Sequence, residues 1–213
     1  MINRTQLANG IRIITQRIPH ACSVTAGIWV VGGSRHEQPE FGGVSHFIEH
    51  LLFKGTEKRT SFEIAREIDS MGGFLNAFTG REFVCYYVKV LSDFFPKALD
   101  LLADIFLNSQ FPEEEIENER KVILQEIKML EDNPDDHVHE LFHRLFWSGH
   151  PMGMPIIGSA ESIQTMSRDF LVNYKKNTYR AGDIIISAAG DLDHNALVEM
   201  LTSYFDSLPT GSS

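Results

Sequence analysis

The order of hydrophobic and polar residues along the chain predicts strands that come in clusters. Residues 5–17 alternate between apolar and polar side chains on either side of Asn9-Gly10, a pair typical of tight turns, and this pattern predicts two short strands. The same reasoning predicts a strand at residues 22–31, a hairpin of residues 74–78 and 83–90, and a strand at residues 183–189.

Apolar residues at helical spacing predict blocks of helices between these strands. We expect helices at residues 44–53, 61–71, 93–109, 112–131, 134–147, 167–176 and 193–204. Ser61 is the expected N-terminal cap of the second of these helices, and Pro112 and Pro134 suit the first turns of theirs. Strand clusters that alternate with helix blocks are typical of an α+β fold, so we predict a mainly antiparallel sheet flanked by helices.

The last residues of the chain differ in composition from what precedes them. Leu208-Pro209-Thr210-Gly211-Ser212-Ser213 is rich in turn-forming and small residues. The length of 213 residues suits one large domain. We therefore expect a single domain at residues 1–208, followed at residues 209–213 by the start of a linker to a second domain that lies outside this sequence.

The overall charge narrows the classes of partner. A formal net charge of −10 argues against a nucleic-acid binder, because neutralising phosphates needs a surplus of Lys and Arg. The chain has no apolar run long enough to span a bilayer and no signal-peptide pattern at its start, so we expect no membrane partner and a cytoplasmic location. Cys22 and Cys85 lie in predicted strands, and we expect both to be buried and reduced.

The helix predicted at residues 44–53 carries a group of side chains suited to metal chemistry. Its apolar residues share one face, whereas His46, Glu49 and His50 fall together on the opposite face. The i, i+4 spacing lets the two imidazoles converge on one ion, with Glu49 beside them. Two histidines leave a tetrahedral zinc short of ligands, and catalytic zinc sites usually add a carboxylate.

The helix predicted at residues 112–131 offers such a carboxylate. Glu119 and Glu126 are two turns apart on one face of this helix. The neighbouring apolar stripe consists of Ile116, Ile123, Ile127 and Leu130. We expect both carboxylates to be partly buried, where a charge is costly unless it is paired or bound to a metal. The sequence thus predicts that this helix supplies the carboxylate half of a zinc site whose other half is His46 and His50, in the inverted order of a known zinc-peptidase motif.

A second, competing motif lies at residues 139–143. His139-Glu140-Leu141-Phe142-His143 matches the ordinary zinc-peptidase pattern, with Glu161 as a conceivable third ligand. The helical projection predicts a buried stripe formed by Val138, Leu141, Phe142, Leu145 and Phe146. That stripe leaves the two histidines at its margin without a companion pair of carboxylates, so we interpret this match as accidental.

Several stretches of the sequence together resemble one known family. They are GGVSHFIEHLLFKGT at residues 42–56, LNAFT at residues 75–79, the pair Glu119 and Glu126, GHP at residues 149–151 and PIIG at residues 155–158. In these stretches the chain is similar to the pitrilysin-like zinc peptidases, whose metal motif is an inverted His-x-x-Glu-His, and in particular to their processing-peptidase branch. The resemblance covers nearly the whole chain and implies the metallohydrolase fold of that branch.

The resemblance also implies roles for individual residues. His46, His50 and Glu126 would be the metal ligands. Glu49 would take a proton from a water activated by the zinc ion and pass it to the leaving amine. Glu119 would orient His50 or assist proton handling.

The same resemblance implies how substrate is bound. The segment at residues 74–79 would be an edge strand on which an extended peptide lies, with Asn76, Ala77 and Phe78 as the expected binding residues. A homologous C-terminal domain or a second subunit would close over the peptide or unfolded protein, and a homodimer is conceivable.

We therefore predict a zinc-dependent endopeptidase and keep two alternatives. The first is a non-catalytic partner or scaffold subunit of a two-half peptidase assembly. The intact set of His46, Glu49, His50 and Glu126 argues against it. The second is a zinc-dependent hydrolase or lyase that does not act on peptides, and the expected substrate strand argues weakly against that.

Overall fold

The computed structural model describes residues 2–212 and consists of one six-stranded sheet with helices against it. The strands are β1 (Ile2–Gln6), β2 (Arg12–Arg17), β3 (Ser23–Val31), β4 (Phe74–Thr79), β5 (Phe83–Leu91) and β6 (Ile184–Gly190). The main helices are α1 (Val44–Leu52), α2 (Ser61–Ser70), α3 (Phe95–Asn108), α4 (Glu113–Asp132), α5 (Pro134–Phe146), α6 (Ala160–Thr165), α7 (Arg168–Thr178) and α8 (His194–Phe205).

The strand order across the sheet is β1-β2-β6-β3-β5-β4. All neighbouring strands run antiparallel except β2 and β6, which are parallel. The prediction of an α+β fold with a mainly antiparallel sheet is therefore confirmed. Strand β6 comes last in the chain but lies between β2 and β3, and β4 forms one edge of the sheet.

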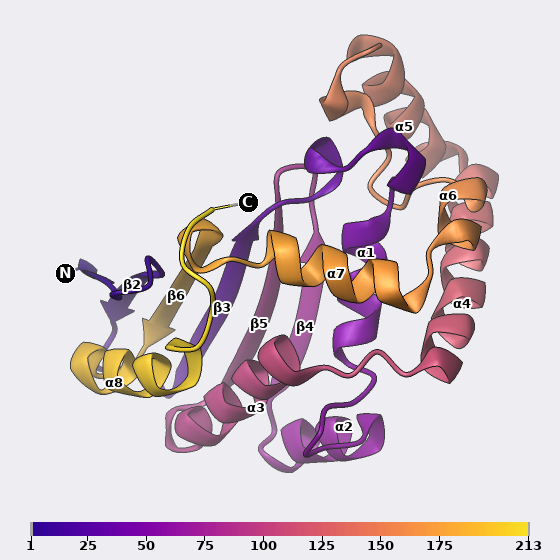
Figure 1. The fold of residues 1–213 in the computed structure, drawn as a ribbon. Coiled ribbons are helices and arrows are strands. Elements are labelled where there is room, and N and C mark those ends of the chain that lie inside the picture. The colour runs from indigo at the N-terminus through magenta and orange to yellow at the C-terminus, as the bar shows by residue number, and fades with distance from the viewer. Residues whose placement is uncertain (1, 213) are drawn as a thin grey trace.

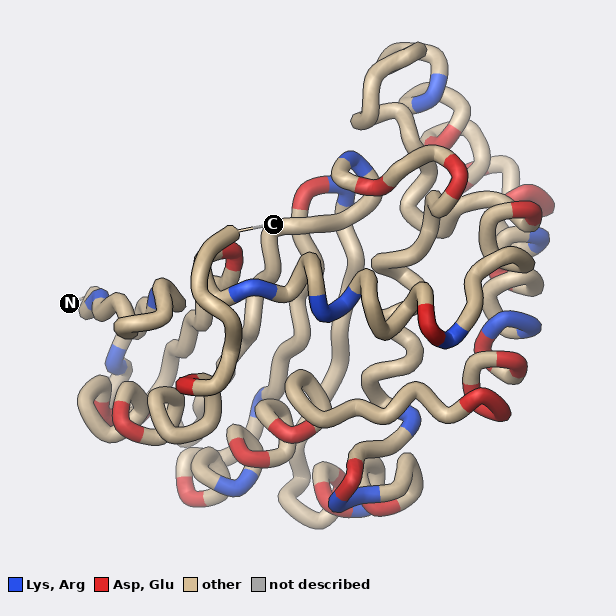
Figure 2. Tube along the Cα trace, in the orientation of Figure 1, with Lys and Arg blue, Asp and Glu red and all other residues tan. Residues whose placement is uncertain are grey.

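The two faces of the sheet have different surroundings. Helices α3, α7 and α8 lie over one face (Figure 1), and alternate residues of the central strand, such as Ile28 and Val30, are fully buried there. The opposite face carries a shallow apolar hollow of about 390 Å³, lined by residues that include Trp29, Phe78 and Tyr87. Figure 2 shows most charged residues on the helices and loops, while the central strands are largely uncharged.

Most helices begin close to their expected positions, with corrections at the caps. Thr60, not Ser61, caps α2, in a capping box with Glu63 in which each side chain binds the other residue's backbone N–H. Pro134 occupies the first turn of α5 as expected, but Pro112 is the residue before α4 rather than part of it. The short helix α6, capped by Ser159, was not among the predicted elements.

The predicted burial of α5 is wrong. None of its residues is buried, and Phe142 and Leu145 are 57% and 74% exposed. A helical projection shows that one face of a helix is apolar, but it cannot show whether another element covers that face. Likewise, Cys85 is buried as expected, whereas Cys22 lies just before β3 and is exposed.

The end of the described chain packs against the domain. The carbonyls of Pro209 and Gly211 accept hydrogen bonds from the backbone N–H groups of Ala181 and Gly182, at 3.1 and 2.8 Å. Among residues 2–212, no helix has both the length and the apolar character needed to cross a membrane.

Candidate metal centre

The start of α1 is held in place by close contacts between loops. Gly43 precedes the helix with a φ of 90°, a conformation that favours glycine. A Cβ atom added to Gly43 would lie 2.5 Å from the carbonyl oxygen of Ile157, so the two loops touch through their backbones. The buried carboxylate of Glu37 accepts hydrogen bonds from the N–H groups of Gly43 and Ser45, at 2.6 and 2.9 Å. These contacts fix where the polar face of α1 points.

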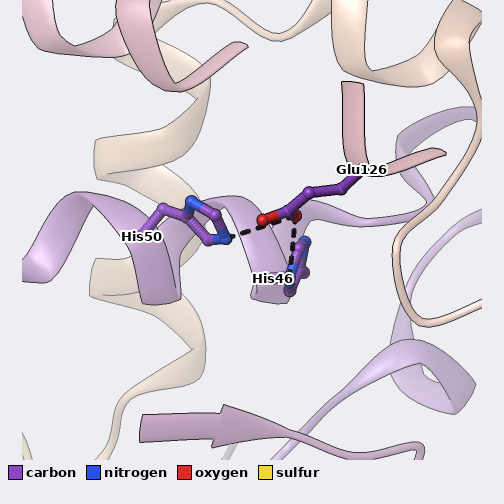
Figure 3. A group of neighbouring side chains, drawn as sticks. All are labelled: His46, His50 and Glu126. Atoms are coloured by element: carbon purple, nitrogen blue, oxygen red, sulfur yellow. Dashed lines mark ion pairs between the residues drawn. The ribbon is translucent and has the colours of Figure 1, made fainter. Parts of the chain in front are cut away.

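That face brings together the three side chains predicted to hold a metal. The Nε2 atoms of His46 and His50 lie 3.8 and 3.7 Å from Oε2 of Glu126. Figure 3 shows the two imidazoles of α1 and the carboxylate of α4 pointing toward one another. All three ligand atoms lie within 4.8 Å of each other, and no other group of three such residues forms in the described part of the chain.

The geometry of this group fits a zinc ion. Ligand atoms about 2.1 Å from a tetrahedral zinc lie roughly 3.4 Å apart, slightly less than the 3.8 and 3.7 Å that separate the carboxylate of Glu126 from the two imidazoles. Burial and the neighbouring His50 lower the pKa of His46 to about 4, so its imidazole is neutral at neutral pH and has a lone pair for a metal. The Nδ1 atom of His46 is buried without a hydrogen-bond partner among residues 2–212. A neutral imidazole makes no ion pair with Glu126, so these side chains are better suited to bind a metal cation together than to pair with one another.

Glu49 lies beside this group without belonging to it. Its Oε2 atom accepts a short hydrogen bond from the hydroxyl of Thr79, at the end of β4. Burial raises the pKa of Glu49, while the bond from Thr79 acts in the opposite direction. Among residues 2–212, the other carboxylate oxygen, Oε1, makes no hydrogen bond.

A second carboxylate supports one of the histidines. Oε2 of Glu119 lies 2.8 Å from Nδ1 of His50, and Oε1 lies 2.6 Å from the ammonium of Lys54. Burial acts to raise the pKa of Glu119, but the bonds from Lys54 and His50 outweigh it and lower the pKa. An ionised Glu119 accepts a hydrogen bond from a protonated Nδ1 of His50. The proton is then on Nδ1, so Nε2 carries the lone pair and faces the side of Glu126.

The expected substrate strand is an edge strand of the sheet. Asn76 and Phe78 are exposed, whereas Ala77 is buried. The backbone N–H of Ala77 donates a hydrogen bond to the side-chain oxygen of Asn76, at 2.8 Å. Through Thr79, the same strand reaches the carboxylate of Glu49.

The competing motif on α5 does not form a comparable group. His139 is exposed, and neither it nor His143 joins a three-residue cluster within the described residues. Glu140 is paired with Arg81 of the β4–β5 turn at 2.8 Å. In this motif the glutamate thus makes an ion pair between two elements.

Sequence reasoning missed three supporting residues. Glu37 was not singled out, and Thr79 and Lys54 stood in stretches of family resemblance without an assigned role. The polar character of Glu37 between glycine-rich segments was the only available signal. Each of the three contacts depends on elements brought together by the fold.

Comparison with known proteins gives these observations a family context. The sequence profile described as Insulinase (Peptidase family M16) matches residues 12–160. The chain is 42% identical over 200 residues to a Bacillus subtilis protein named "Uncharacterized zinc protease YmxG", a match that covers 94% of this chain and 49% of that protein. The chain spans about half the length of the curated relatives that it matches.

Two solved structures share the fold. A protease from Helicobacter pylori matches all of this chain and 52% of its own, with a TM-score of 0.93 at 23% identity. A peptidase M16 inactive domain from Pseudomonas fluorescens matches all of this chain and 52% of its own, with a TM-score of 0.92 at 18% identity. Because a domain described as inactive has the same fold, catalysis must be argued from the side chains.

Proposed function

Because the chain belongs to the insulinase family of peptidases, family M16, we propose that it is the zinc-binding catalytic domain of an endopeptidase that cleaves extended peptides or precursor proteins. The observation that carries this proposal is the convergence of His46, His50 and Glu126, with Glu49 beside them. In the proposal these three residues hold one zinc ion and Glu49 is the general base.

The roles of the side chains follow from their positions. When bound, zinc supplies Lewis acidity, which polarises a peptide carbonyl and makes water more acidic. Glu49 accepts a proton from water at Oε1 while Thr79 holds Oε2, and it then delivers the proton to the leaving nitrogen. Glu119 keeps His50 in the tautomer that offers Nε2 to the metal.

The edge strand β4 is suited to bind the peptide backbone. A strand added to a sheet edge is recognised through its main-chain groups, which all peptides share. Binding of this kind allows peptides of many different sequences to be accepted. A carbonyl of the peptide would replace the side-chain oxygen of Asn76 as the acceptor of the hydrogen bond from the N–H of Ala77. The side-chain amide of Asn76 would then be free to contact the peptide. Phe78 is exposed and lies on the sheet face away from the main core.

The remaining parts of the proposal concern the whole protein. A domain at residues 1–208 followed by a linker at residues 209–213 fits the observation that relatives are about twice as long. In the proposal, a homologous second half, in the same chain or in a second subunit, closes over the peptide. The cytoplasmic location stays a prediction, as does the homodimer.

The decisive experiment compares the two motifs in the full-length protein. Glu49→Gln should retain zinc and lower the rate of peptide cleavage by about 10²- to 10⁴-fold, because the general base is lost. Glu140→Gln is the matched control in the competing motif and should leave the rate within about twofold, since Glu140 lies in an ion pair with Arg81.

Metal content tests the ligands separately. His46→Ala should lose stoichiometric zinc, whereas His139→Ala should keep it. A wild-type protein that binds zinc but cleaves no peptide would favour the scaffold alternative. Cleavage at the wild-type rate by Glu49→Gln would show that Glu49 is not the general base.

A further inference from the structure

We propose that Lys54 is a positioning residue of the metal centre, which holds the carboxylate of Glu119 so that Glu119 orients His50. This inference rests on the proposed function, because it assigns Lys54 a role in zinc binding. The three groups form a chain of contacts, with Lys54 Nζ 2.6 Å from Oε1 of Glu119 and Oε2 of the same carboxylate 2.8 Å from Nδ1 of His50.

The backbone of Lys54 is fixed by its surroundings. Its N–H donates to the carbonyl of Leu51 at the end of α1, at 3.1 Å. The next residue, Gly55, has a φ of 125°, and its carbonyl accepts a hydrogen bond from the N–H of Gln110 at 3.1 Å. Lys54 therefore projects from a constrained turn between α1 and α2, and its reach to Glu119 does not depend on a mobile loop.

Glu119 needs a second partner besides His50. Its side chain is only 9% exposed, so water contributes little to balancing its charge. In the described residues, Lys54 provides the only Lys or Arg ion pair to this carboxylate. With Oε1 held by Lys54 and Oε2 facing His50, the carboxylate has one orientation, and the imidazole that it contacts is held in turn.

The charge of Lys54 and its proposed positioning role predict opposite changes in zinc affinity when the lysine is removed. A lysine cation near a bound Zn²⁺ repels it, so removing the lysine charge should tighten zinc binding if nothing else changed. If Lys54 acts by positioning Glu119, removing it should weaken zinc binding instead. The sign of the change therefore separates the two roles.

The test measures zinc affinity of the full-length protein by competition with a chelator, independently of proteolysis. Lys54→Met should weaken zinc binding by about 10- to 100-fold, the range typical of residues that support metal ligands. Lys54→Arg, which keeps a cation in reach of Glu119, should recover most of the affinity. Lys58→Met is the matched control, because it removes the same charge four residues away at an exposed position and should leave affinity unchanged.

A double-mutant cycle with Glu119→Gln then tests the route of the effect. If Lys54 acts through Glu119, Lys54→Met should change zinc affinity less than about twofold in the Glu119→Gln background. Equal loss in both backgrounds would overturn the inference, and so would unchanged or tighter zinc binding by Lys54→Met alone. Zinc bound tightly by a protein that cleaves no peptide would refute the proposed function while leaving this inference intact. Absence of zinc binding by the wild type would refute both.

Discussion

One hydroxyl links the proposed base to the proposed substrate strand. Thr79 lies at the end of β4 and donates to Oε2 of Glu49. Burial raises the pKa of Glu49, and the bond from Thr79 favours the ionised carboxylate. The fraction of Glu49 able to accept a proton therefore depends on a residue of the strand that would hold the peptide.

We predict that Thr79→Val moves the acidic limb of the kcat/KM pH profile to higher pH. A general base works only when ionised, so activity falls as the pH drops through its pKa. Loss of the Thr79 bond raises that pKa further, and activity on the acidic limb should fall by about tenfold, the equivalent of one hydrogen bond to a charged group. Thr79→Ser should restore the profile. An unshifted limb in Thr79→Val with normal zinc content would contradict the prediction.

The sequence allowed the residues on one helix face to be grouped, but not their supports. The 3.6-residue period placed His46, Glu49 and His50 together. The cost of burying a charge pointed to Glu119 and Glu126 alike, and only the family resemblance chose Glu126 as the ligand. No periodicity connects Lys54 with Glu119, because they lie on different elements whose contact is created by the packing of α4 against α1.

At the scale of elements, the position of α1 depends on two loops that touch through their backbones. Gly43 and Gly158 both have positive φ, and side chains at either position would meet the opposite loop. The hydroxyl of Ser162, on α6, donates to the carbonyl of Gly42 at 2.7 Å. The helix that carries both histidines is thus anchored by residues more than a hundred positions later in the chain.

We predict that Gly43→Ala destabilises the protein by about 2–4 kcal/mol, because it adds a backbone clash to the cost of a left-handed conformation. The added Cβ would lie 2.5 Å from the Ile157 carbonyl oxygen. Gly72→Ala is the matched control. Its φ of 58° is also positive, but nothing lies within 4 Å of the added Cβ, so it should cost only about 1 kcal/mol.

Urea denaturation of the two variants measures this difference, and zinc affinity of Gly43→Ala should fall as α1 shifts. Equal stability of the two variants would show that the loop contact is not constraining.

Strand and helix positions could largely be predicted from hydrophobic periodicity. The elements that pack against or pair with each of them could not. The period shows that α5 has an apolar face, but Phe142 is more than half exposed on it. The parallel pairing of β2 with β6 is equally invisible to local patterns, because it joins segments from opposite ends of the chain.

At the scale of the whole molecule, the candidate metal centre lies near one edge of the sheet, because α1 packs beside the edge strand β4. The chain spans about half the length of its curated relatives, and in the proposal a second half closes over the bound peptide. Closure would exclude water and align the peptide with Glu49.

We predict that the 213-residue chain alone binds zinc but cleaves peptides at least about a hundredfold more slowly than the two-half protein. The proposed ligands all lie in this chain, whereas in the proposal the other half is needed to clamp the peptide. Zinc content and peptide cleavage measured on both proteins at equal concentration check this. Equal cleavage rates would show that one half is sufficient.

The place of β6 within the sheet determines when the sheet can be completed during synthesis of the chain. His46, His50 and Glu126 leave the ribosome well before residues 184–190, yet β2 has only β1 beside it until β6 arrives to join it to β3. A nascent chain therefore carries every proposed ligand while its sheet is still in two pieces. If these residues hold a metal as proposed, we expect stable loading at the end of translation of this domain rather than when the proposed ligands first appear.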